Sequence, residues 1–156
     1  MEYSELIQGF ADRYGIAGLA AADGVGTVEI DGLKVSLIHD DAADAVTIYG
    51  EVGFPPPDAD GPFGGTMLKA NHLFRGTGGA VLCQDPETGA YALFRVLPLV
   101  SLDLDALCAE IGKLVDQVEN WKSLMEGFLE AEEAAEDAAG EAAEFNSLPG
   151  GGFMQV

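Results

Sequence analysis

The sequence predicts an α+β fold in a single domain, with helices packed on a mostly antiparallel, twisted sheet. Three observations predict it. Segments that alternate apolar and polar residues come in two groups, a short helical pattern precedes each group, and a long helical pattern follows the second. The expected order is therefore helix, three strands, helix, two strands, long helix. A length of 156 residues suits one domain of this kind.

The first helix is predicted over residues 2–14, because its apolar residues are spaced by three and four and so share one face. Gly15 follows and suits a helix end. The apolar residues of this face are Tyr3, Leu6, Ile7, Phe10 and Tyr14.

Three strands are predicted next, at Val25–Ile30, Leu33–His39 and Ala45–Phe54. Asp31-Gly32 is typical of the tight turn of a hairpin. In the second strand Leu33, Val35 and Leu37 alternate with polar residues, which is the pattern of a half-buried strand. Short connections between the three favour an antiparallel meander.

The second half of the domain starts after a proline-rich surface loop, Pro55–Pro62. Thr66–Phe74 is predicted to be a short helix, which the glycines at 76, 78 and 79 end. Ala80–Gln84 and Tyr91–Leu97 are predicted to form a hairpin, because the turn-forming residues 85–89 separate them.

The longest helical pattern covers Asp103–Glu133, and its apolar residues recur at alternating steps of three and four. Cys108 and Val115 widen this stripe beyond a coiled-coil seam, which favours a helix laid on a sheet. The predicted domain covers residues 1–134, and residues 135–156 are predicted to be an acidic, Ala/Gly-rich flexible tail.

Composition excludes some partners. Seven basic and 27 acidic residues give a net charge of −20, which disfavours nucleic acids and anionic membranes. The sequence shows neither a signal-peptide pattern nor an apolar run long enough to span a bilayer, so we expect a cytoplasmic protein. Cys83 and Cys108 are expected to be buried, reduced thiols.

Little in the sequence points to catalysis, and we predict no catalytic residue, no cofactor and no metal site. The glycine-rich segment 76–79 lacks the lysine and serine of a phosphate-binding loop and follows a helix, so it is predicted to be a turn. His39 with Asp40, Asp41 and Asp44 lacks the spacing of a calcium loop. A chain with abundant apolar faces and few catalytic groups favours binding of another protein.

The order and spacing of several segments resemble class I type III secretion chaperones, the family that includes the Tir chaperone. The resemblance extends from about Leu6 to Trp121. The residues that carry it are Tyr14-Gly15-Ile16, Ile30-Asp31-Gly32, the segment Leu68–Ala80, Asp85–Gly89, Leu97-Pro98-Leu99, Leu102-Asp103 and Trp121. The proline-rich loop and the Ala/Glu-rich tail are departures from this pattern.

The resemblance implies a homodimeric chaperone that binds the N-terminal segment of a secreted effector in an extended state, without ATP. Two sets of residues are predicted to serve these contacts. For the partner they are Leu6, Ile7, Phe10, Leu33, Val35 and Leu37, which would equally suit a core; for the dimer they are Leu68, Leu73, Phe74 and Val81.

Three other functions stay open at this point. An adaptor or immunity-type protein of the same fold would bind a folded partner. A hydrolase would use acidic residues with His39 or His72, and an acidic scaffold would use the tail after Glu130.

Overall fold

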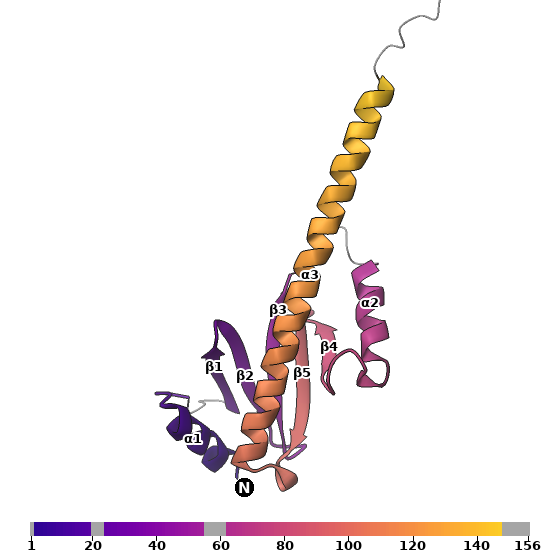
Figure 1. The fold of residues 1–156 in the computed structure, drawn as a ribbon. Coiled ribbons are helices and arrows are strands. Elements are labelled where there is room, and N and C mark those ends of the chain that lie inside the picture. Colours follow the sequence, from indigo (N-terminus) through magenta and orange to yellow (C-terminus); the bar gives the residue numbers. More distant parts are fainter. Residues whose placement is uncertain (1, 20–23, 55–61, 148–156) are drawn as a thin grey trace, which may run out of the picture. The chain divides into compact units, whose positions relative to one another are not determined.

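The computed structural model describes residues 2–19, 24–54 and 62–147 (Figure 1). The chain divides into two compact units, residues 1–122 and 123–156. The first unit contains the sheet and the helices packed on it. The described helices are α1 (Tyr3–Tyr14), α2 (Pro62–Asn71) and α3 (Leu104–Ser147), with short 3₁₀ turns η2 (His72–Phe74) and η3 (Leu99–Ser101). Helix α3 contributes residues to both units.

The strands are β1 (Val25–Ile30), β2 (Leu33–Asp40), β3 (Ala45–Gly53), β4 (Val81–Gln84) and β5 (Tyr91–Pro98). They form one sheet in the order β1-β2-β3-β5-β4, and every neighbouring pair is antiparallel. The α+β prediction is therefore confirmed, with all five strands within a residue or two of their expected positions. Asp31 and Gly32 both have positive φ, 50° and 80°, as a two-residue primed turn between β1 and β2 requires.

One face of the sheet is covered by α1 and by the first part of α3 (Figure 1). Leu37, Ile48 and Leu93 on this face are fully buried. Gly50 lies on the same face, where a Cβ atom would come within 2.7 Å of Val118 Cγ2 on α3. The wide apolar stripe of α3 thus packs against the sheet as predicted, and the glycine allows the close approach.

Helix α2 begins earlier than predicted, at Pro62 instead of Thr66. Proline is accepted in the first turn of a helix. The next residue, Phe63, is buried and stacks on Tyr91 with ring centroids 5.1 Å apart, while Trp121 approaches its edge at 6.1 Å. This aromatic cluster anchors the first turn of α2 although Gly64 and Gly65 disfavour a helix. Residues 55–61 of the predicted loop lie outside the described residues.

Helix α3 extends further than predicted, to Ser147 instead of Glu133. Alanine and glutamate dominate this extension, and both are strong helix formers. Residues 135–147, predicted to be part of the flexible tail, are therefore helical. The domain boundary at residue 134 stays a prediction, and residues 148–156 lie outside the described part of the chain.

Candidate functional site

A groove of about 500 Å³ opens on the first unit where the end of α1, strand β1 with its turn, and α3 meet. Its base is apolar: Phe10, Val28 and Ile111 are buried there, and Ile16 and Ile30 are half-buried. The residues that line it are Phe10, Tyr14, Ile16, Val28, Glu29, Ile30, Asp31, Cys108, Ile111, Gly112, Val115 and Asp116.

Gly112 adds no side chain to the α3 wall of this groove. A Cβ atom at this position would meet no atom within 4 Å, so no part of the described structure requires a glycine here for space. Glycine in a helix interior costs about 1 kcal/mol relative to alanine. The open groove is thus bordered by a residue that helix stability alone would disfavour.

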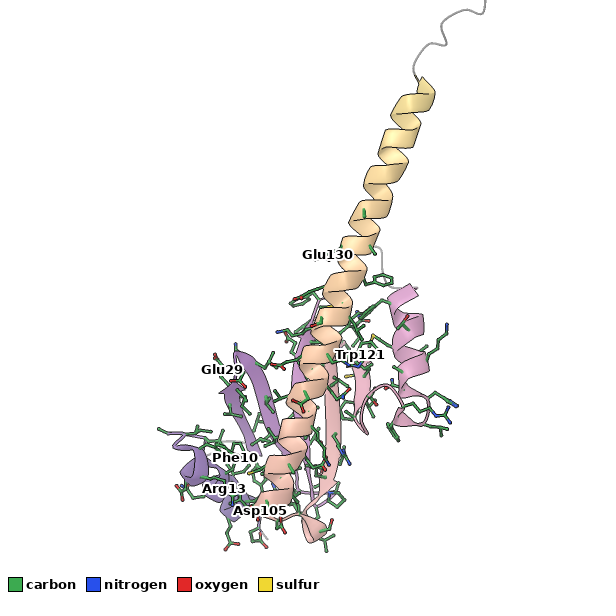
Figure 2. The ribbon with its side chains drawn as sticks, viewed as in Figure 1. Phe10, Arg13, Glu29, Asp105, Trp121 and Glu130 are labelled. Atoms are coloured by element: carbon green, nitrogen blue, oxygen red, sulfur yellow. The ribbon has the colours of Figure 1, made fainter. Side chains whose placement is uncertain are left out.

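An ion pair lies next to Cys108, one of the residues that line the groove. Arg13 Nη1 lies 2.7 Å from Asp105 Oδ1 and 3.5 Å from the Sγ atom of Cys108, and Figure 2 shows Arg13 on α1 beside Asp105 at the start of α3. The hydrogen bond to Asp105 raises the pKa of Arg13 above its ordinary value. A hydrogen bond with Cys108 likewise raises the pKa of the neighbouring Tyr14. The guanidinium is therefore already paired within the protein.

The two edges of the sheet differ. At β4 the side-chain amide of Asn71 donates to the Leu82 carbonyl at 3.0 Å and accepts from the Leu82 N–H at 2.9 Å. Asn71 thus takes the place of a neighbouring strand. Strand β1 pairs only with β2 among the described strands, and β1 also borders the groove. The sheet therefore offers an unpaired edge next to an apolar groove, where an extended chain could add a strand.

Replacing Asn71 with leucine is expected to lower the free energy of unfolding by about 2 kcal/mol, because two backbone groups of the buried Leu82 lose their partners. Asn71→Asp, which keeps the acceptor and loses the donor, should lie between this variant and the wild type. Urea unfolding followed by circular dichroism measures the difference. Equal stability of Asn71→Leu and the wild type would contradict this role for Asn71.

The six residues predicted for partner binding lie in the core. All of them are at most 6% exposed, so the structure puts them in the alternative role that the sequence also allowed. Phe10 alone among them lines the groove. A direct contact between a client and Leu6, Ile7, Leu33, Val35 or Leu37 stays a prediction, and it would require these side chains to leave the core.

The four residues predicted for a dimer lie at the surface of α2, η2 and β4. Leu68, Leu73 and Phe74 are 74%, 68% and 50% exposed, and Val81 is half-buried. Leu73 and Phe74 also have positive φ, 54° and 55°, which bulky side chains rarely adopt. Exposed apolar side chains on a strained backbone are typical of an interface, so these positions fit the dimer prediction without testing it.

His39 and the glycine-rich segment 76–79, also considered as possible sites from the sequence, make contacts that hold the fold together. Tyr3 stacks on His39 with ring centroids 4.4 Å apart, and its hydroxyl donates to the carbonyls of Gly24 and Leu37. The predicted turn at 76–79 is confirmed, and the indole N–H of Trp121 donates to the Gly76 carbonyl at 3.1 Å.

Within the described ranges, no cluster of three or more His, Cys, Asp or Glu residues could hold a metal ion. No helix in the described part of the chain is long and apolar enough to cross a membrane.

Most of the residues that line the groove were not among the predicted site residues. Its α3 wall comes from Cys108 and Val115, which the sequence showed only as a stripe wider than a coiled coil needs. Its other wall comes from Val28 and Ile30. A surplus of apolar width on the long helix was the available signal, but the opposing wall lies about 80 residues earlier in the chain.

Solved structures share the fold. A chain of the HopA1–SchA chaperone–effector complex is 22% identical with a TM-score of 0.65, over 78% of this chain and 93% of that one. A chain of the ExsC–ExsE complex is 21% identical with a TM-score of 0.67, over 80% and 97%. A chain of the Yersinia pestis complex of the type III secretion chaperone SycH with a stable fragment of YscM2 is 20% identical with a TM-score of 0.62, over 77% and 99%.

No curated protein sequence gives a significant match. The model of the Tir chaperone protein (CesT) family does match, over residues 5–122. This range covers most of α1, the whole sheet, α2 and the part of α3 that lies in the first unit. Since the match includes most of the chain and all of the sheet, this protein belongs to the Tir chaperone (CesT) family.

Proposed function

We propose that this chain is a cytoplasmic type III secretion chaperone that binds the N-terminal region of a secreted effector in an extended state and keeps it export-competent without ATP. The observation that carries the proposal is the apolar groove beside the unpaired edge of β1. An extended client could pair its backbone with β1 while every second side chain enters the groove. Structures with this fold include a chaperone–effector complex and a type III secretion chaperone bound to a protein fragment, which supports the same assignment.

The hairpin geometry supports pairing at β1. In a two-residue hairpin the pair that flanks the turn, here Ile30 and Leu33, is hydrogen-bonded across the ladder. Hydrogen-bonded and non-hydrogen-bonded pairs alternate along an antiparallel ladder, so Thr27 and Glu29 belong to non-hydrogen-bonded pairs. Their backbone N–H and C=O groups therefore point away from β2. An incoming strand would satisfy these groups, and no ATP-driven opening of the sheet is needed.

We also propose a homodimer formed through α2, η2 and β4. The exposed side chains of Leu68, Leu73 and Phe74 form the apolar part of this surface. Net charge of −20 would keep a dimer with further exposed apolar groups soluble. The dimer surface and the client groove use different elements, so both contacts could be made at once.

The proposed function is tested by recovering the tagged chain from its native cells under secretion conditions. The bound partner is identified, and its protected region is mapped by limited proteolysis. We expect a stoichiometric partner protected only near its N-terminus. A compactly folded partner, resistant to protease when free, would favour the adaptor alternative.

A matched pair of variants locates the contact on the chaperone. Gly112→Leu places a side chain in the groove, where a Cβ meets no neighbour, and leucine favours a helix more than glycine does. We expect unchanged or higher thermal stability and client affinity weaker by about tenfold or more, equivalent to ~1.4 kcal/mol. Gly127→Leu, the same change at an equally open glycine of α3, is the control and should bind as the wild type does. Equal binding by the two variants would place the client elsewhere.

A further inference from the structure

The border of the groove carries charge of one sign. Among its lining residues, Asp31 follows β1 and Asp116 lies on α3, and both are exposed. Glu29 is also exposed, but it lies between Val28 and Ile30, so its side chain points to the other face of the sheet. The lining contains no lysine or arginine. The nearby Arg13 is paired with Asp105 at 2.7 Å, and Lys34 lies across the β1–β2 ladder from Glu29. With Lys34 included, the groove border keeps an excess of negative charge.

We infer that the groove selects extended client segments in which apolar side chains are flanked by lysine or arginine. This inference rests on the proposed function, because it assumes that the groove holds a client. The apolar base made by Phe10, Val28 and Ile111 would take the apolar side chains. Asp31 and Asp116 at opposite borders would pair with the flanking cations, and they would repel a segment that carries acidic residues.

The expected preference is moderate. Each exposed ion pair changes affinity only a few-fold, so two or three of them together give about a tenfold preference. The attraction also extends beyond contact distance and falls as salt screens it. Selection by charge should therefore weaken at high ionic strength, whereas the apolar contribution should persist.

Three fluorescein-labelled peptides test the inference. They share a central segment in which leucine, valine and isoleucine alternate with serine, and the residues that flank this segment on both sides are lysine, serine or glutamate. Fluorescence anisotropy with the full chain should rank them lysine, serine, glutamate, with about a tenfold difference between the first and the last at low salt. Equal affinities of the three peptides, or failure of the lysine peptide to bind at all, would overturn the inference.

Charge variants separate a local effect from that of the overall charge. Asp31→Asn with Asp116→Lys should reduce the preference to about twofold or less; asparagine suits the positive φ of residue 31. Asp41→Asn with Glu126→Lys makes the same change in net charge at exposed positions that do not line the groove, and should keep the preference. Loss of the preference in both variants would assign it to the overall charge and overturn the inference.

The Gly112→Leu variant distinguishes this inference from the proposed function. If it abolishes binding of all three peptides while their affinities for the wild type are equal, the groove holds clients but does not select them by charge. If it leaves the binding of every peptide unchanged, the groove is not the client site and both proposals fail.

Discussion

Replacing Phe10 with aspartate is expected to unfold the first unit or bring it close to unfolding. The ring is 2% exposed and lies at the base of the groove, 4.9 Å from the Tyr14 ring. Removing a buried phenylalanine side chain costs about 3–5 kcal/mol, and burying a carboxylate adds to this. Domains of this size are stable by only about 5–15 kcal/mol. Urea unfolding monitored by circular dichroism measures the loss.

Tyr14→Asp is the matched control for Phe10→Asp. Tyr14 is one turn further along α1 and 57% exposed, so its replacement should lower stability by about 1 kcal/mol, far less than Phe10→Asp does. A stable, folded Phe10→Asp variant that no longer binds its client would contradict the expectation. It would show that Phe10 contacts the client instead of supporting the core.

Replacing Leu68 and Leu73 together with aspartate is expected to convert the proposed dimer into a folded monomer. The two side chains are 74% and 68% exposed, so the fold does not depend on their burial. Aspartate also tolerates the positive φ of residue 73 better than leucine does. Two central apolar contacts of an interface contribute about 2 kcal/mol or more each, so the dissociation constant should rise by at least about 100-fold.

Sedimentation equilibrium at micromolar concentration measures this change. Val100→Asp is the control, because Val100 is 86% exposed but lies on η3, away from α2 and β4 in the chain. It should remain dimeric. A wild-type chain that sediments as a monomer at this concentration, or a double variant that stays dimeric, would remove the dimer proposal.

Local periodicity was sufficient to predict the strands to within a residue or two. Alternation in Leu33–Asp40 and the turn residues Asp31-Gly32 predict a hairpin, because a strand has a period of two and a primed turn needs positive φ. The start of α2 was not predictable in this way. It depends on Phe63 packing between Tyr91 and Trp121, which are distant in sequence.

The candidate site shows the same division between local pattern and tertiary contact. Leu37 and Leu68 are both apolar residues at regular spacing, yet Leu37 is fully buried and Leu68 is 74% exposed. Periodicity tells which side chains share a face, but it does not tell whether another element covers that face. The groove could not be predicted, because its walls come from three segments that only the folded chain brings together.

The α+β class, the order of the elements, the negative charge and the resemblance to the chaperone family could all be derived without the structure. These properties depend on composition and on short-range spacing. The folded chain was needed to place Phe10 and Leu33 in the core and Leu68 and Leu73 at the surface. It was also needed to show that β1, beside the groove, pairs with just one of the other described strands. Burial and edge pairing depend on which elements pack against each other across the chain, and short-range spacing does not specify this packing.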